Sequence, residues 1–202
     1  MKYLIAAAIW VGFGVIHSVL ISLRLSDWSK RVMGQYFAFY RFGYNLLSAV
    51  LFFVLLYFTK TLDSELVIKF VPPWPILQQG ILVASIVVII WALLSYDALE
   101  FVGIRQIMNV RKNKAVDHPK TITKKGLLGI IRHPMYLATI VFIWSLNSTR
   151  VDILVHLVLT MYILIGIRLE ERKLIIELGL AYTEYQKEVP ALVPFLKNWK
   201  KH

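Results

Sequence analysis

Long runs of apolar residues with almost no charge constrain this chain more than any other feature. The runs Tyr3–Leu23, Tyr36–Phe58 and Gly80–Tyr96 each approach or exceed the roughly 20 residues that a helix needs to cross a bilayer. With 58% hydrophobic and only 17% charged residues, the chain carries more apolar surface than a water-soluble domain of 202 residues can bury. The sequence therefore predicts an all-α integral membrane protein.

Two shorter apolar segments follow near the C-terminal end. Pro134–Leu146 is short, and the turn Asn147–Asp152 joins it to Ile153–Ile167. We therefore expect about five transmembrane helices in a single domain, residues 1–202. A polar connector, Arg24–Gln35, separates the first two spans. Met1-Lys2 and the apolar run after them resemble a signal peptide, but no small-residue cleavage site follows, so we expect a retained span.

The distribution of Lys and Arg predicts the orientation of these spans. The loops after the first, third and fifth runs together carry 18 Lys and Arg residues, whereas the other side carries 4. Cytoplasmic loops are the ones enriched in these residues. We therefore expect the N-terminus outside and the C-terminus in the cytoplasm, in the cell membrane, as in a bacterial inner membrane. The net charge of +11 then reflects the Lys and Arg residues of these cytoplasmic loops, and we expect membrane lipid but no nucleic acid as a partner.

The absence of cysteine narrows the chemistry. A chain with zero Cys has no disulfide, no thiolate metal site, no iron–sulfur cluster and no catalytic cysteine. Polar residues inside or at the edge of a hydrocarbon layer are costly, so they are the best indicators of function. They form five groups: His17-Ser18; Tyr40-Arg41 with Tyr44-Asn45; Asp97 with Glu100; Arg132-His133-Pro134-Met135-Tyr136; and Arg168-Leu169-Glu170-Glu171, which continues through Gly179, Tyr182 and Tyr185.

Some of these residues have purely structural interpretations. His17 can simply bond a neighbouring carbonyl, and Arg41 can be the structural partner of Asp97 or Glu100, since charges inside a membrane usually pair. The last two groups carry more chemical information. Pro134 suits the first turn of a helix, and the backbone donors expected around His133 suit an anionic group. Neighbouring carboxylates suit hydroxyl groups, so the combination is typical of a site for an amino-acid nucleoside.

These two groups also carry a resemblance. Arg132 to Tyr136, Glu170-Glu171, the segment Gly179–Tyr185 and Val189-Pro190 through Pro194 resemble, in order and spacing, the isoprenylcysteine carboxyl methyltransferase superfamily. The match covers about residues 103–195. Upstream, His17-Ser18, Arg41 with Tyr44-Asn45, and Gly103-Ile104-Arg105-Gln106 resemble a narrower group, which contains methanethiol S-methyltransferases and NnrU-type proteins associated with denitrification.

The resemblance implies that S-adenosylmethionine is the methyl donor, bound at the cytoplasmic face where a C-terminal helix and loop form the cofactor pocket. By position, His133 and Tyr136 would meet the amino-acid end of the donor, Glu170 its ribose or sulfonium end, and Arg132 would brace the loop. Only one of the two adjacent carboxylates is expected to face the pocket, so Glu171 is expected to matter less. The remaining implied donor contacts are Gln106, the backbone of Thr121, Ile122 and Thr123, and Leu128.

The methyl acceptor is inferred from a position at which this chain differs from the pattern of the carboxyl methyltransferases. The carboxyl methyltransferases place a substrate-binding Arg four residues before the first Glu, where this chain has Gly166, while Arg168 lies two residues before it. This disfavours a carboxylate acceptor and favours a small or lipophilic thiol such as methanethiol. The candidate catalytic residues are His17, Arg41, Asp97, Glu100 and Arg168, with His17, Asp97 or Glu100 as the base; no metal is expected.

Other functions stay open at this point. On the same scaffold, the acceptor can be a lipid or isoprenoid carboxyl or amine group. From another class, the chain can be a non-catalytic accessory protein of nitrogen-oxide respiration of the NnrU type, with His17 and His156 holding a metal or haem. A double-bond reductase is a third possibility. The oligomeric state is not indicated by the sequence.

Overall fold

The computed structural model describes residues 1–62, 64–95, 99, 102–111, 122 and 124–194. The chain divides into two compact units. Unit 1 comprises Met1–Ile68, Tyr96–Asp117 and Ser148–Leu159; unit 2 comprises Lys69–Ser95, His118–Asn147 and Thr160–His202. The prediction of one domain over residues 1–202 stays a prediction.

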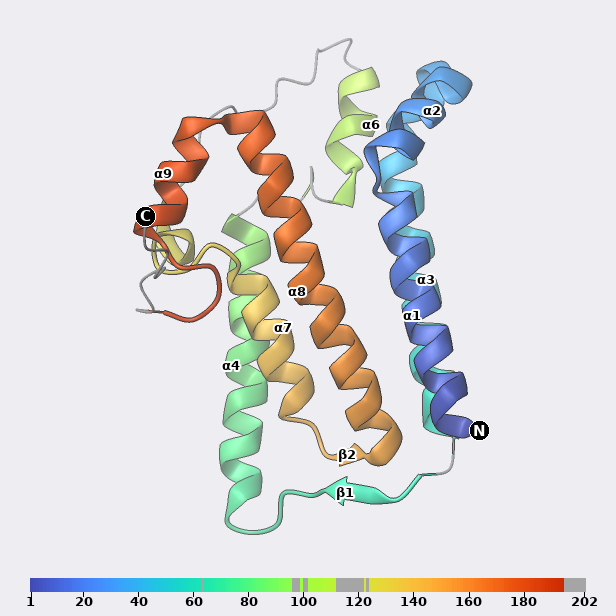
Figure 1. The fold of residues 1–202 in the computed structure, drawn as a ribbon, viewed down its shortest axis with the longest axis vertical. Coiled ribbons are helices and arrows are strands. Elements are labelled where there is room, and N and C mark those ends of the chain that lie inside the picture. Colours follow the sequence, from blue (N-terminus) through green and yellow to red (C-terminus); the bar gives the residue numbers. More distant parts are fainter. Residues whose placement is uncertain (63, 96–98, 100–101, 112–121, 123, 195–202) are drawn as a thin grey trace. The chain divides into compact units, whose positions relative to one another are not determined.

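Almost all the described secondary structure is helical (Figure 1), as the sequence predicts. In unit 1 the elements are α1 (Lys2–Leu20), α2 (Leu23–Met33), the 3₁₀ helix η1 (Gly34–Phe39), α3 (Tyr40–Thr61), β1 (Leu66–Ile68), α6 (Ile104–Arg111), β2 (Ser148–Thr149) and the beginning of α8 (Arg150–Leu178). Unit 2 contains α4 (Trp74–Ser95), the 3₁₀ helix η2 (Gly126–Gly129), α7 (Pro134–Trp144), the rest of α8 and α9 (Leu180–Glu188).

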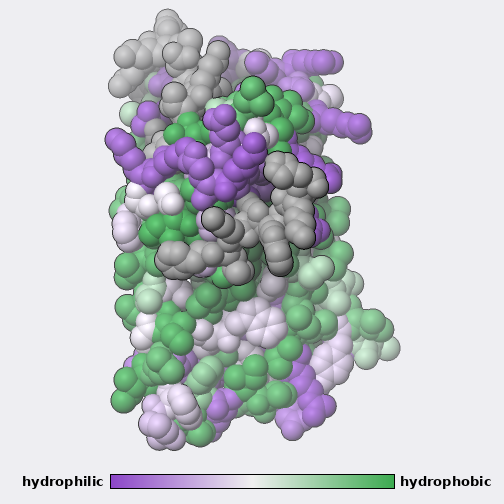
Figure 2. Space-filling model, turned by 60° about the vertical axis from the view of Figure 1, so that its left-hand side comes forward, coloured by the Kyte–Doolittle hydropathy of each residue, from purple (hydrophilic) through white to green (hydrophobic). Residues whose placement is uncertain are grey.

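The lengths of these helices confirm a multi-pass membrane protein. Among the described residues, four helical stretches are long and apolar enough to cross a bilayer: α1, the stretch Leu23–Thr61 that contains α3, then α4 and α8. Apolar side chains cover most of the helix surface visible in Figure 2, and hydrophilic side chains lie toward the helix ends. Apolar side chains on the surface of a membrane-spanning helix contact lipid chains and not water. The exposed apolar faces of these helices are therefore what a bilayer requires.

The fourth predicted span differs from expectation. Pro134–Leu146 yields only the 11-residue helix α7, about 16 Å long and too short to cross alone. At its end, Gln78 of α4 donates to the Ser145 carbonyl (2.9 Å), and Asn147 accepts a bond from the Phe70 backbone (3.0 Å). These side chains satisfy an irregular backbone that would be costly in lipid. The bond from Gln78 also shows that α7 ends beside the beginning of α4.

Unit 1 is organised around Trp10, which is only 1% exposed. Its ring packs edge-on against Phe13 and Phe52, and together with Ala6 it contacts Val151 and Val155 in the first turns of α8. The indole nitrogen donates to the Thr59 hydroxyl (2.9 Å), so the single polar atom of this large ring has a partner. Trp10 thereby joins α1, α3 and the beginning of α8.

The beginning of α8 is fixed by a reciprocal cap. The Asp152 carboxylate accepts from the backbone N–H of Thr149 (3.0 Å), and the Thr149 hydroxyl accepts from the N–H of Asp152 (3.2 Å). This is the arrangement of a capping box. Lys60, at the end of α3, donates to the same carboxylate (2.8 Å). The short antiparallel pair of β1 and β2 leads into this cap, with Leu66 opposite Thr149.

Candidate functional site

The entrance to α7 holds the first group of predicted site residues. His133 is the residue before the helix, and Pro134 occupies the first helical position, where its missing N–H costs nothing. The backbone N–H groups of Arg132 and His133 donate to the carbonyls of Pro190 (2.9 Å) and Ala191 (3.0 Å). These two donors are therefore not available to an anionic group, because the segment after α9 occupies them.

Arg132 is the centre of the contacts around this entrance, and its side chain is 4% exposed. Its Nε and Nη2 donate to Glu171 Oε1 at 2.8 and 2.5 Å, and its Nη1 donates to the carbonyls of Gln186 (3.1 Å) and Val189. Gln186 in turn donates to the other oxygen of Glu171 (2.9 Å). Arg132 thus ties α8, α9 and the segment after α9 to the beginning of α7, the bracing contact expected from the sequence.

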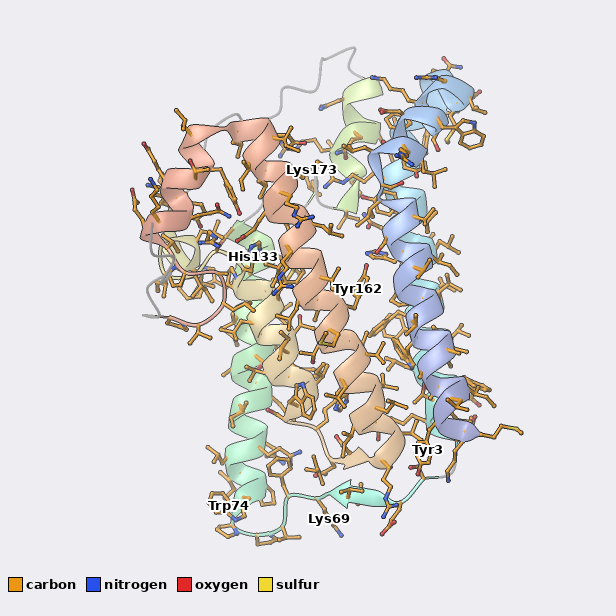
Figure 3. All side chains as sticks on the ribbon, in the orientation of Figure 1. Tyr3, Lys69, Trp74, His133, Tyr162 and Lys173 are labelled. Atoms are coloured by element: carbon orange, nitrogen blue, oxygen red, sulfur yellow. The ribbon has the colours of Figure 1, made fainter. Side chains whose placement is uncertain are left out.

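His133 lies beside α8 at the beginning of α7 (Figure 3) and is also 4% exposed. Its Nε2–H donates to Glu171 Oε1 (3.1 Å), and its Nδ1 lies 3.9 Å from Glu170 Oε2. The Tyr136 ring stacks on the imidazole, and the Tyr136 hydroxyl donates to Glu170 Oε2 (3.0 Å). Both carboxylates therefore approach His133, and which of them faces the donor stays a prediction.

The two carboxylates nevertheless differ in what they can bind. The Glu171 side chain is 16% exposed and accepts bonds from Arg132, His133 and Gln186, whereas the Glu170 side chain is 44% exposed and accepts one from Tyr136. Glu170 therefore retains acceptor capacity for a ligand, and Glu171 serves to hold its protein neighbours. We call Arg132, His133, Tyr136, Glu170, Glu171 and Gln186 the Arg132 cluster.

Helix α9 adds an aromatic wall in the same unit. Tyr182 and Tyr185 are buried and pack with Val189 against Ile122 and residues of α8. The Tyr185 hydroxyl donates to the carbonyl of Leu128 (2.5 Å), which places Leu128 at this wall. Burial raises the pKa of Tyr185 to about 12 and raises the pKa of Tyr182 as well, so both hydroxyls stay neutral donors at physiological pH.

Two predicted donor contacts lie outside the described residues, and a third belongs to unit 1. Thr121 and Thr123 are outside them. Arg168, which is predicted as a catalytic residue and not as a donor contact, is exposed on α8, one turn before Glu171. Gln106 belongs to unit 1, where its amide oxygen accepts from Arg41 Nη1 (3.2 Å) and its amide nitrogen donates to the carbonyl of Gly103 (3.1 Å).

Unit 1 thus has a polar group of its own around Arg41, in the first turn of α3. Tyr44, one turn along α3, is hydrogen-bonded to Arg41, and Asn45 donates to the carbonyl of Val102 (3.1 Å). We call Arg41, Tyr44, Asn45, Gly103 and Gln106 the Arg41 group. The predicted partners of Arg41, Asp97 and Glu100, lie outside the described residues, so that pairing stays a prediction.

Gly103 permits the close approach on which the Arg41 group depends. Its φ of +98° is rarely adopted by other residues, and a Cβ at this position would lie 2.6 Å from the backbone nitrogen of Phe42. The turn that precedes α6 can therefore lie directly on α3 only if this residue is glycine. The backbone contact in turn places Gln106 beside Arg41.

His17 and His156 also lie in unit 1. His17 Nδ1 is 2.8 Å from the hydroxyl of buried Ser48, and the imidazole stacks on Phe13. His156 is buried on α8, one turn after Asp152. Within the part of the chain that the structure describes, no group of three or more His, Asp or Glu side chains is placed to hold a metal ion.

Sequence reasoning missed Gln186 and Ser48. Each pairs with a residue distant in the chain, Gln186 with Glu171 across 15 positions and Ser48 with His17 across 31. Neither contact follows from helical periodicity, which relates only residues within one helix. The nearest available signal was the Gly179–Tyr185 motif, which marks the helix on which Gln186 lies.

Together these features define a multi-pass helical membrane protein with a charged, hydrogen-bonded site at one helix entrance. The chain is 32% identical over 129 residues to a methanethiol S-methyltransferase of Pseudomonas sp. (strain GM41(2012)), covering 60% of this chain and 47% of that protein. It is 29% identical over 196 residues to the protein of the same name from Pseudomonas deceptionensis, covering 92% of this chain and 70% of that protein. The corresponding Mycobacterium tuberculosis protein is 26% identical over 201 residues, covering 91% and 74%.

The chain is therefore a relative of the methanethiol S-methyltransferases, which confirms the relationship predicted from its motifs. In the first of these alignments the chain spans about half the length of its relative. No family model matches the chain. No solved structure matches it.

Proposed function

We propose that this protein is an S-adenosylmethionine-dependent methyltransferase whose acceptor is a small thiol such as methanethiol. The observation that carries the proposal is the half-exposed Glu170 carboxylate, held by Tyr136 beside a buried cluster whose other charges are already paired. The names of the relatives, methanethiol S-methyltransferase, support both the reaction and the acceptor. Membrane lipid is the other partner that we propose, beside the methyl acceptor.

The residues present fit the proposed donor. S-adenosylmethionine has ribose hydroxyls and an ammonium group, which donate hydrogen bonds, and a positively charged sulfonium. The Glu170 carboxylate can accept hydrogen bonds from the hydroxyls or the ammonium, and its negative charge is opposite to that of the ammonium and the sulfonium. Tyr136 fixes the position of this carboxylate. Arg132 and Glu171 keep the imidazole of His133 and the segment after α9 in place, so the donor would meet a preorganised site.

Bound S-adenosylmethionine supplies an electrophilic methyl group on a sulfonium sulfur. The thiol proton must leave for the sulfur to attack, because a thiol with a pKa near 8.5 is mostly protonated at neutral pH. His17, held by Ser48, is the candidate base among the described residues, and Asp97 and Glu100 are the candidates outside them. Arg41, which is hydrogen-bonded to Gln106 and Tyr44 among the described residues, would favour a thiolate electrostatically.

Donor binding is tested by calorimetry with S-adenosylhomocysteine on the purified protein. We expect His133→Ala and Glu170→Gln to weaken binding about tenfold to 150-fold, the effect of losing a hydrogen bond to a charged group worth roughly 1.5–3 kcal/mol. Glu184→Gln, which removes an exposed carboxylate from α9, is the matched control and should bind normally. Unchanged affinity in both site variants would place the donor elsewhere.

The acceptor is tested with labelled S-adenosylmethionine and four compounds in parallel: methanethiol, a longer alkyl thiol, a prenylcysteine and phosphatidylethanolamine. Gly166, at the position where the carboxyl methyltransferases carry a substrate-binding Arg, favours the thiols. Methylation of the prenylcysteine or the phospholipid with both thiols inert would replace the thiol by a lipid or isoprenoid acceptor. No reaction and no donor binding would favour the accessory protein of nitrogen-oxide respiration.

We also propose that the N-terminus lies outside the cytoplasm and the C-terminus inside, in the cell membrane. The support is the excess of Lys and Arg, 18 against 4, on the predicted cytoplasmic side. Helix α7 is short, but it ends beside the beginning of α4. In this topology we therefore count α7 as the fourth crossing of the membrane, between α4 and α8. Reporter fusions that place both ends on one side would contradict this topology.

A further inference from the structure

Helix α2 begins at the edge of the membrane because of the length of α1. The 19 residues of α1 span about 28 Å, close to the thickness of the hydrocarbon layer. Only Ile21 and Ser22 separate the two helices, and the Ser22 hydroxyl donates to the carbonyl of Val19 (2.7 Å) and accepts from the N–H of Leu25 (3.4 Å). Ser22 therefore ends one helix and begins the next at the level of the lipid headgroups.

The chain that follows α2 keeps it at that level. Gly34 ends α2 with a φ of +51°, and α2 packs against η1. The Tyr40 hydroxyl, at the beginning of α3, donates to the carbonyl of Leu20 at the end of α1 (2.7 Å). Because α3 re-enters the membrane beside the end of α1, residues 21–39 are confined to this end of unit 1, as Figure 1 shows.

The side chains of α2 divide into an inner and an outer face. Leu25, Ser29 and Met33, spaced four residues apart, are buried or half-buried. Trp28 is 60% and Val32 is 64% exposed, one turn apart, and they form a strip that borders the inner face. Three cations, Arg24, Lys30 and Arg31, are exposed around the rest of the helix with one carboxylate, Asp27. The predicted polar connector is thus an amphipathic helix with an exposed apolar strip and an excess of positive charge.

We propose that α2 is an interfacial helix that binds anionic phospholipid headgroups. Trp28 and Val32 enter the boundary between headgroups and acyl chains, where a Trp ring is favoured. Arg24, Lys30 and Arg31 contact lipid phosphates, and the charge excess over Asp27 selects anionic over zwitterionic lipid. An Arg guanidinium also forms paired hydrogen bonds with phosphate oxygens. The inference is independent of the methyltransferase activity.

The experiment measures which lipid lies next to Trp28. The protein is reconstituted into vesicles of one fixed mixture of phosphatidylcholine and phosphatidylglycerol, with a brominated chain on one lipid or on the other. The fluorescence of Trp28 is the difference between the wild type and Trp28→Phe. Per mole of lipid, we expect brominated phosphatidylglycerol to quench Trp28 about twofold or more better than brominated phosphatidylcholine. Raising the salt to about 0.5 M should reduce this preference, because it screens exposed charges.

Two controls separate the proposal from a general charge effect. The triple variant Arg24→Gln, Lys30→Gln, Arg31→Gln should lose the preference, whereas Lys125→Gln, Lys173→Gln, Lys187→Gln, which removes three exposed cations from unit 2, should keep it. Equal quenching of wild-type Trp28 by both lipids would overturn the proposal. Trp28 unquenched by either lipid would also overturn it, and would assign the strip of Trp28 and Val32 to water or to a soluble partner. Both results are obtained on the wild type, so they do not depend on the folding of a variant.

Discussion

The Arg132 cluster and the Arg41 group each contain an arginine among polar residues, but the two arginines have different kinds of partner among the described residues. Arg132 is ion-paired with Glu171 and also donates to the backbone carbonyls of Gln186 in α9 and of Val189 after it. Among the described residues, Arg41 is hydrogen-bonded to the neutral side chains of Gln106 and Tyr44. The first arrangement consists of buried, mutually paired charges, and the second depends on close backbone packing at Gly103.

The difference indicates two tasks. A buried ion pair with every hydrogen bond satisfied is rigid, and breaking one partner is costly. The Arg132 cluster is therefore suited to hold a large polar ligand such as the proposed donor in one geometry. Among the described residues, the Arg41 group presents a cation with neutral neighbours, which fits the proposed stabilisation of a small anion such as a thiolate. The two groups should accordingly respond to substitution with effects of different size and kind.

The largest expected effect is a loss of stability in Arg132→Gln. The substitution leaves the Glu171 carboxylate without its cation and the carbonyls of Gln186 and Val189 without their donor. Breaking a buried pair typically costs about 3–5 kcal/mol, so the thermal midpoint in detergent should fall by roughly 6–20 °C for a chain of this size. Arg172→Gln, an exposed neighbour on α8, is the control. A midpoint unchanged from the wild type would show that the cluster does not hold α9.

A smaller loss is expected from Gly103→Ala, which tests the packing of the Arg41 group. The new Cβ would lie 2.6 Å from the Phe42 nitrogen in a strained φ, at a cost of about 1–3 kcal/mol. Gly43→Ala, in the adjacent turn of α3, has no atom within 4 Å of the new Cβ and should be neutral or stabilising by up to about 1 kcal/mol. The measurement is the thermal midpoint, together with the KM for the thiol. Equal midpoints for the two variants would mean that the close approach at Gly103 is unimportant.

The smallest effect concerns the pH dependence of stability through α9. The pKa of Tyr185 is about 12 in the folded protein and near 10 in the unfolded chain, so the folded state retains a proton that the unfolded state loses. The contribution of Tyr185 to the free energy of unfolding is fully present below pH 10 and is lost as the pH rises toward 12. Between pH 10 and 11 the free energy of unfolding should fall by about 1 kcal/mol through this residue. Tyr185→Phe should show a shallower fall over that range. Parallel curves for the two proteins would argue that Tyr185 ionises equally easily in both states.

The sequence predicted four of the five spans as long helices and, except for Gln186, the residues of the Arg132 cluster, but not how those residues share their contacts. Apolar runs and the Arg132-to-Tyr136 motif are local patterns, and α1, α3, α4 and α8 form where those runs lie. The fourth run became only α7, because the chain leaves the helix at Ser145, where Gln78 and Asn147 satisfy the backbone. Most of the predicted polar connector Arg24–Gln35 forms α2. Its apolar side chains have a helical spacing, but the charged residues between them make this spacing hard to recognise in the sequence.

What the sequence by itself determined is the membrane environment, the helical class and the set of costly polar residues, because these depend on composition and on patterns within single helices. Only the tertiary structure decided that Glu171 holds Arg132 while Glu170 stays half-exposed, although the two carboxylates are adjacent in the chain. The physical reason is that Arg132 and Gln186, whose side chains both donate to Glu171, come from separate segments. Their convergence on one carboxylate depends on how α7, α8 and α9 pack.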